Sequence, residues 1–158
     1  MSQAHESFER PVFADSLQPL GALTMELPPN CILVDNPTIL SQTITELYSL
    51  PKTLTPSLYV DLEGIDLCRN GSISIIQVYA SPTSKTYLID VFTMGALAFS
   101  TPSTNGLTLK SLLEDASIMK AFYDCRNDND ALWNLYQIDT AGTSIILNMS
   151  FGDLILIL

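Results

Sequence analysis

The chain has 158 residues, a formal net charge of −10 and a sequence pI near 4.2. This length allows one domain with a sizeable core, and 47% hydrophobic against 15% charged residues argues against a disordered chain. The acidic balance disfavours passive nucleic-acid binding, because a basic surface normally supplies most of the non-specific affinity for phosphates. An acidic chain can still handle nucleic acid where metal ions bridge its carboxylates to phosphates.

The cysteines and the N-terminal residues indicate the cellular compartment in which we expect the protein. The three cysteines are scattered, and the single histidine, His5, lies in a polar stretch. We therefore expect neither a zinc site nor a disulfide framework. Residues 1–10 contain no apolar segment of the kind found in secretory signals, and the apolar end of the chain is too short to span a bilayer. These features indicate an intracellular protein, cytoplasmic or nuclear, with no membrane association.

In chain order, residues 1–30 predict an irregular leader, because they contain four prolines and little periodicity. Residues 31–35 predict a short buried strand. A helix is expected to begin at Asn36-Pro37 and to end before Pro51. We assign residues 31–56 to an N-terminal extension and residues 57–158 to the main domain.

The main domain opens with three strands, expected over residues 57–62, 72–80 and 85–91. Strands joined by such short turns must be antiparallel neighbours. A loop over 92–106 follows, with one helical turn at 94–99.

The remaining elements alternate. A helix is expected to bury Leu109, Leu112, Leu113 and Ile118 on one side. A short strand then covers residues 119–124, and a second helix is capped by Asn127 or Asp128. The second helix is expected to turn Ala131, Leu132, Leu135 and Tyr136 inward. The order β-β-β-α-β-α predicts an α/β, ribonuclease H-like fold with a mixed sheet and helices packed on its faces.

The first strand carries the most informative pattern, Val60-Asp61-Leu62-Glu63-Gly64. Side chains alternate along a strand, so Asp61 and Glu63 point to one face while Val60, Leu62 and Ile65 can face the core. Two like charges side by side disfavour each other unless a cation or a proton lies between them. The pattern therefore indicates a divalent-metal site.

A second acidic cluster, Asp124, Asp128 and Asp130, surrounds the junction of the fourth strand and the second helix. Strand ends beside helix starts are where α/β proteins usually place their sites. Asp61, Glu63 and Asp128 are our candidate catalytic and metal-binding residues, with Mg²⁺ or Mn²⁺ as the cations, since these prefer hard oxygen ligands. Two such ions would orient a water and stabilise an in-line phosphodiester displacement.

Several other residues have two readings. Gln77 is expected to make a buried hydrogen bond to backbone. Arg126 could neutralise the acidic cluster or touch a phosphate, but a surface ion pair is the simpler role. The tyrosines on the strands and Trp133 could stack on bases, although packing is the first expectation.

At this point the chain resembles the ribonuclease D/Werner type of 3′-5′ exonuclease domain, a branch of the DEDD superfamily, and within it the fungal 3′-5′ exonuclease domain-containing proteins. The resemblance spans roughly residues 57–138 and is carried by the segments VDLEG at 60–64, LCRNGSISIIQV at 67–78, YLIDV at 87–91, LKSLLED at 109–115 and KAFYDCRNDNDAL at 120–132. It implies hydrolysis at single-stranded 3′ ends, of RNA or DNA, by two-metal catalysis. It also implies that Asp61 and Glu63 are metal ligands. Asp128 is the corresponding ligand of the second motif, eight positions after Lys120.

The sequence departs from this family at its C-terminal side. Members carry a later helix with Tyr-x3-Asp, which supplies a further ligand and a water-positioning tyrosine, and residues 139–158 contain no such motif. We therefore expect impaired exonuclease activity and leave open whether the chain is an enzyme. One alternative is an inactive module that binds nucleic acid or protein. Another is a truncated fragment without function.

Overall fold

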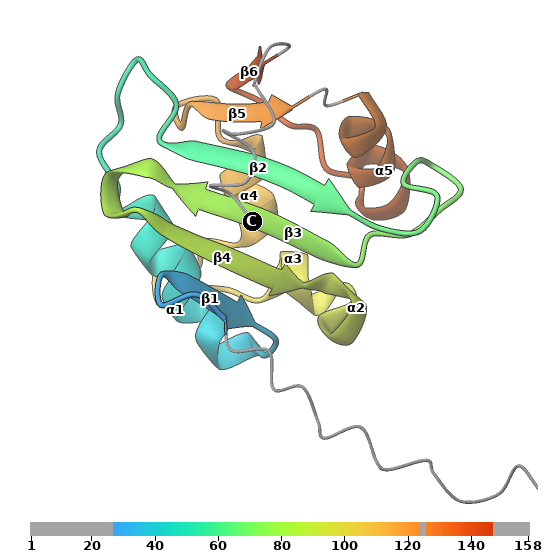
Figure 1. Cartoon of the computed structure of the whole chain (residues 1–158), viewed down its shortest axis with the longest axis horizontal. Helices are drawn as coiled ribbons and strands as arrows, with labels where there is room; N and C mark the ends of the chain where they lie inside the picture. The colour runs from blue at the N-terminus through green and yellow to red at the C-terminus, as the bar shows by residue number, and fades with distance from the viewer. Residues whose placement is uncertain (1–26, 124–125, 147–158) are drawn as a thin grey trace, which may run out of the picture.

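The described residues fold around a six-stranded sheet (Figure 1), with strand order β1-β4-β3-β2-β5-β6. The computed structural model describes residues 27–123 and 126–146. Expectations for Asp124, for residues 1–26 and for residues 147–158 lie outside this range. The strands are β1 (Cys31–Val34), β2 (Leu58–Glu63), β3 (Ile75–Ala80), β4 (Lys85–Asp90), β5 (Lys120–Tyr123) and β6 (Thr143–Ile146).

The three central strands form the antiparallel meander that their short turns predict. β2 pairs with β3, and β3 pairs with β4, both antiparallel. β1 lies parallel to β4 at one edge, while β5 lies parallel to β2 and β6 parallel to β5. The predicted mixed sheet is therefore confirmed. β6 was not predicted from the sequence.

Figure 1 shows α1, α3 and α4 behind the sheet. The helices are α1 (Pro37–Tyr48), α2 (Val91–Met94), α3 (Leu97–Ser100), α4 (Leu109–Glu114) and α5 (Arg126–Tyr136), with a 3₁₀ turn at Ser81–Thr83. α1 begins as predicted, because the Asn36 side chain accepts hydrogen bonds from the amides of Thr38 and Ile39, both at 3.1 Å. The predicted loop over 92–106 contains two short helices, α2 and α3, in place of one helical turn. α4 ends at Glu114, so Ile118 is buried but does not lie on this helix as predicted.

Alternation along β2 decides which side chains reach the core. Leu58, Val60 and Leu62 are buried, and on the neighbouring strands they pair with other buried residues, such as Val78 and Ile76. This face of the sheet packs with the helices into one hydrophobic core. The opposite face carries Tyr59, Asp61 and Glu63. The prediction for Ile65 is wrong, because β2 ends at Glu63 and Ile65 is exposed.

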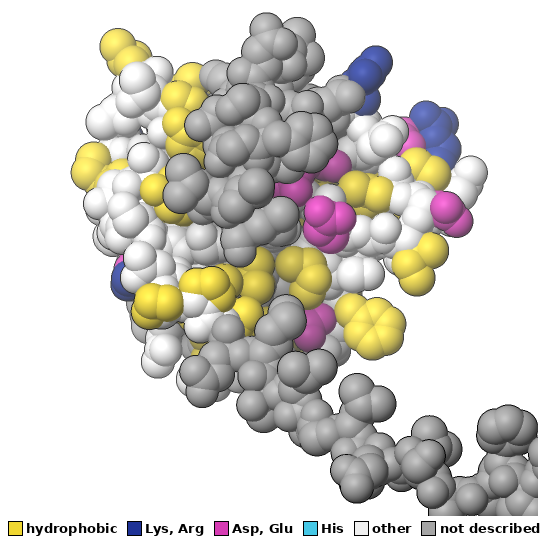
Figure 2. Space-filling model, viewed as in Figure 1, with side chains coloured by type: hydrophobic (Ala, Val, Ile, Leu, Met, Phe, Trp, Pro, Cys, Tyr) yellow, Lys and Arg dark blue, Asp and Glu magenta, His cyan; other side chains and the backbone are white. Residues whose placement is uncertain are grey.

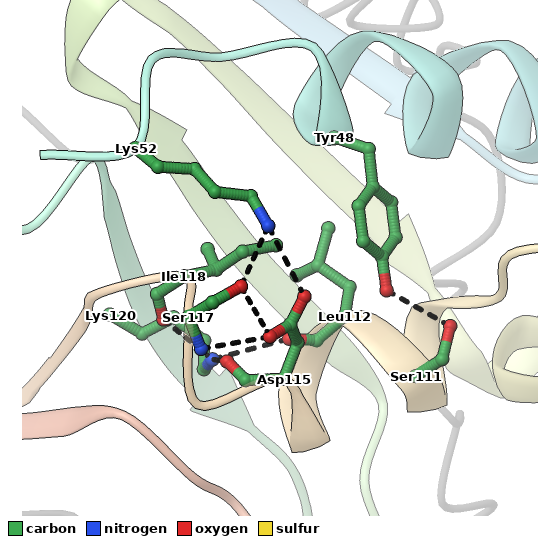
Figure 3. Close-up of polar contacts among 8 residues, drawn as sticks. All are labelled: Tyr48, Lys52, Ser111, Leu112, Asp115, Ser117, Ile118 and Lys120. Carbon is green, nitrogen blue, oxygen red and sulfur yellow. Dashed lines mark hydrogen bonds and ion pairs between the residues drawn. The ribbon is translucent and has the colours of Figure 1, made fainter.

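Lys120, the first residue of β5, is fully buried. Figure 3 shows its polar contacts. Its ammonium donates hydrogen bonds to three backbone carbonyls, of Leu112 at 3.2 Å, Asp115 at 2.8 Å and Ile118 at 2.8 Å. These carbonyls lie at the end of α4 and in the turn that follows it. Since a helix end leaves its last carbonyls without intrahelical partners, Lys120 joins the end of α4 to the start of β5.

The domain boundaries proposed from sequence stay a prediction. β1 lies in the same sheet as the strands of residues 57–158, and α1 packs against the same core. No helix in residues 27–123 and 126–146 is long and apolar enough to cross a membrane.

Candidate functional site

Asp61 and Glu63 project from the same face of β2, as the alternation predicts. Asp61 is half-buried and Glu63 is exposed. Burial raises the pKa of Asp61, the negative charge of Glu63 raises it further, and a hydrogen bond from the Leu62 amide opposes both. The ionised form of Asp61 is therefore destabilised, and a bound cation would stabilise it.

No lysine or arginine of the described residues neutralises this pair within ion-pair distance. The ion pairs join Lys52 to Asp115, Arg69 to Asp130, Lys85 to Glu46 and Lys110 to Glu114. Asp90 lies on the same face of the sheet, but its carboxylate accepts from the amide and hydroxyl of Thr93 and caps α2. Asp61 and Glu63 thus offer uncommitted hard oxygen donors, which fit Mg²⁺ or Mn²⁺.

Gly64 is required by the turn that ends β2. The Ser74 amide donates to the Glu63 carbonyl at 2.7 Å, and the Ser72 amide donates to the Ile65 carbonyl at 2.9 Å. This brings the two segments so close that a Cβ at Gly64 would lie 1.8 Å from the Ser72 carbonyl oxygen. The glycine in the motif therefore permits a tight return of the chain directly beyond the two carboxylates.

Asp128 lies in the first turn of α5, and only 5% of its surface is exposed. Because β5 runs parallel to β2, the two strands end on the same side of the sheet, and α5 begins there. Figure 1 shows α5 beside these strand ends. The fold thus brings the Asp61–Glu63 pair and the Asp128 helix to one end of the sheet. A helix start is also favourable for a negative charge.

The start of α5 differs from the sequence expectation. The helix begins at Arg126, so Asn127 and Asp128 both lie within its first turn, and neither occupies the capping position predicted for them. The expectation placed the helix start too late, because a cap is defined by the backbone that precedes the helix and not by residue type alone.

The three predicted ligands are not gathered into a ready metal cluster. In the described parts of the chain, no three acidic, cysteine or histidine side chains lie close enough together to hold a metal ion. The assignment of Asp61, Glu63 and Asp128 as a ligand set stays a prediction.

Asp130 has a structural role that the sequence did not reveal. Its carboxylate accepts from the backbone amide of Arg69 at 2.8 Å and from Nε at 3.1 Å, and it pairs with Nη2 at 2.8 Å. These hydrogen bonds lower the pKa of Asp130, the backbone one most. Arg69 lies in the loop after β2, so this clamp ties the end of β2 to α5.

Arg126, for which we expected a surface ion pair, is exposed.

The expectation for Gln77 is wrong in one respect. Gln77 is 3% exposed, but its Oε1 has no hydrogen-bond partner among the described residues. The register places Gln77 directly opposite Asp61 on the neighbouring strand.

The aromatic residues divide between core and surface. Tyr87 is buried, whereas Tyr59 and Tyr79 are half-buried and lie with ring centroids 6.0 Å apart. Trp133 is 52% exposed, so the packing role predicted for it is wrong. Of the α5 residues predicted to point inward, Ala131 and Leu132 are buried, Tyr136 packs on Phe99, and Leu135 is exposed.

Figure 2 shows acidic side chains gathered on this face over the region where β2 ends.

Comparison with known proteins identifies the family of the chain. The family model described as 3′-5′ exonuclease matches residues 31–149. The chain belongs to this 3′-5′ exonuclease family.

Solved structures agree with the family. The chain resembles RNase D from Trypanosoma brucei, in a complex with RNA U12, with a TM-score of 0.59 and 27% identity, over 72% of this chain and 36% of that one. The exonuclease domain of EXD2 matches with a TM-score of 0.57 and 22% identity, over 73% of this chain and 56% of that one, which supports the fold. The predicted ribonuclease H-like α/β fold is thus confirmed.

A curated relative matches part of the chain. The mouse piRNA biogenesis protein EXD1 is 40% identical over 81 residues, which are 51% of this chain and 13% of that protein. The chain therefore spans a small part of EXD1 and about a third of the RNase D chain. The family match begins at residue 31 and so includes β1 and α1, which lie outside the 57–138 range of the sequence resemblance.

Proposed function

We propose that this exonuclease domain hydrolyses phosphodiester bonds at nucleic-acid 3′ ends with the help of divalent cations. The observation that carries the proposal is the Asp61–Glu63 pair, which shares one face of β2 and has no described lysine or arginine to neutralise it. Because the chain belongs to the 3′-5′ exonuclease family, we assign phosphodiester hydrolysis to this pair.

Each residue has a proposed role. Asp61 and Glu63 hold the cations, Mg²⁺ or Mn²⁺, and Asp128 contributes from the start of α5. Bound there, the cations would supply charge neutralisation for the phosphate and a more acidic water as nucleophile. The raised pKa of Asp61 supports this role, because the ionised form gains more from a nearby cation than a well-solvated carboxylate would.

The proposed substrate is single-stranded RNA or DNA with a free 3′ end. The RNase D structure with RNA U12 is of a relative 27% identical to this chain, which favours RNA. The net charge of −10 is unfavourable for phosphates, so substrate binding should depend strongly on the divalent cation.

A second candidate function is nucleic-acid binding without cleavage. One observation favours it, namely that no three ligand-type side chains in the described residues form a metal cluster. This candidate predicts retention of a single strand without its shortening.

The test is to incubate the protein with a 5′-labelled single-stranded RNA and Mn²⁺, and to resolve the products by length. We expect shortening from the 3′ end, loss of activity with a chelator, and a fall of at least about 100-fold in Asp61→Asn. The impairment expected from the sequence stays a prediction, and it would make the shortening by wild type slow. Asp90→Asn is the matched control, because Asp90 lies on the same face but caps α2. Retention of the RNA without shortening would select the second candidate. Equal shortening by wild type and Asp61→Asn would refute the proposed site.

A further inference from the structure

Gln77 occupies a position that packing alone does not explain. It lies in the middle of β3 and is 3% exposed, yet its Oε1 receives no hydrogen bond from any described residue. A buried carbonyl oxygen without a donor is costly, since burial removes the water that would otherwise satisfy it. An apolar residue of similar shape would suit this strand better.

The register shows what Gln77 faces. Asp61 of β2 is its direct cross-strand partner, and Leu88 of β4 is its partner on the other side. Directly opposite residues of antiparallel strands share one face, with Cβ atoms about 5 Å apart. Glu63 is the diagonal neighbour, two residues along β2. Gln77 therefore lies on the same face as both carboxylates, directly opposite Asp61 and diagonal to Glu63.

The side chains around Gln77 on this face limit which groups could donate a hydrogen bond to its Oε1. The neighbours of Gln77 along β3 are Ile75 and Tyr79, both half-buried. On β2 its direct partner is Asp61, and Glu63 and Tyr59 are its diagonal neighbours. On β4 the diagonal neighbours are Thr86 and Asp90, and no hydroxyl among these side chains donates to Oε1. Carboxylates are acceptors when ionised and cannot donate to Oε1. A donor that arrives together with a cation can.

We propose that Gln77 is a positioning residue of the cation site, whose Oε1 accepts a hydrogen bond from water in the hydration shell of a divalent cation held by Asp61 and Glu63. Mg²⁺ keeps several waters when it binds to protein carboxylates, so such a donor accompanies it. The inference rests on the proposed function of the carboxylate pair. It adds a residue that fixes the water shell and thereby the affinity for the cation.

Replacing Gln77 should affect the stability of the metal-free protein and its affinity for the cation differently. Gln77→Met removes the buried acceptor and keeps the length of the side chain. The thermal midpoint of the metal-free protein should therefore stay the same or rise. The affinity for Mn²⁺, measured by calorimetry or by the EPR signal of the free ion, should fall about tenfold or more, as when hydrogen-bond partners around other metal sites are removed.

Two further variants sharpen the test. Leu88→Met places the same side chain on the same face, one strand further from Asp61, and should leave Mn²⁺ affinity unchanged. Gln77→Glu keeps an acceptor oxygen and adds a negative charge. It should therefore retain or increase Mn²⁺ affinity while lowering the stability of the metal-free protein.

The outcomes are distinguishable. If Gln77→Met binds Mn²⁺ as tightly as wild type while Asp61→Asn does not bind it, the role of Gln77 is refuted and the proposed function stands. If Gln77→Met lowers the metal-free thermal midpoint and the affinity together, Gln77 is a structural residue and the inference fails. If wild type binds no Mn²⁺, the inference and the proposed cation site are both overturned.

Discussion

Replacement of Lys120 by methionine should change the pH dependence of stability by an amount that the structure allows us to calculate. Lys120 is fully buried, and burial lowers its pKa from 10.5 to about 8, an effect that the charge of Asp115 opposes. Because the folded-state pKa is the lower one, the folded protein releases this proton at a lower pH than the unfolded chain does. Stability therefore rises as the pH passes from about 8 towards 10.5.

The size of the effect follows from proton linkage. Near pH 7 both states hold the proton, and near pH 10 the folded state has released it while most unfolded chains have not. The gain of wild type over Lys120→Met between these two pH values is on the order of 2–3 kcal/mol. The difference at pH 7 alone is less informative. Removing the ammonium leaves three carbonyls without their donor but also removes a buried charge, and these two terms oppose each other.

The assay is urea unfolding of wild type and Lys120→Met near pH 7 and near pH 10. Lys110→Met is the matched control, because its ammonium is partly exposed in an ion pair with Glu114. Titration of all other groups cancels between variant and wild type. A wild-type minus Lys120→Met difference that stays constant to within about 0.5 kcal/mol would refute the description of Lys120 as a desolvated ammonium.

Three further outcomes are expected. Gly64→Ala should destabilise the fold by more than about 3 kcal/mol in chemical unfolding, because the new Cβ would overlap the Ser72 carbonyl; a loss below about 1 kcal/mol would contradict the tight turn. Asp130→Ala should destabilise more than Arg69→Ala, since the second change leaves the amide of residue 69 bonded to Asp130; the order of the thermal midpoints decides, and the reverse order counts against the clamp. Asp61→Asn should raise metal-free stability near pH 7, where the raised pKa makes the ionised wild-type group unfavourable, and the gain should vanish as the pH falls below the ordinary carboxyl range; a gain independent of pH would disagree with that cause.

Local sequence signals were sufficient where neighbours in the chain decide the structure. The Asn36 cap, the short turns of the meander and the alternation in β2 depend on adjacent residues, and the structure confirms them. The same alternation placed Asp61 and Glu63 on one face. Since the period of a strand is fixed at two residues, this placement follows from the sequence once the strand is recognised.

The sequence failed where partners lie far apart in the chain. The Arg69–Asp130 clamp joins residues 61 positions apart, and nothing local distinguishes it from two solvated charges. Trp133 carries no sign of its exposure, because a helix pattern does not say where the neighbouring layer ends. The strand-opening lysine likewise gave no hint that its ammonium would be buried beneath the end of α4.

The sequence by itself determined the mixed α/β class, the family resemblance and the carboxylate pair of β2. Only the tertiary structure placed α5 with Asp128 at the same end of the sheet, through the parallel pairing of β2 with β5, and set Gln77 opposite Asp61. The physical reason is that local dihedral preferences and side-chain periodicity are encoded residue by residue. Strand pairing and register are instead decided by burial across the whole core, where each contact joins segments that the sequence keeps apart.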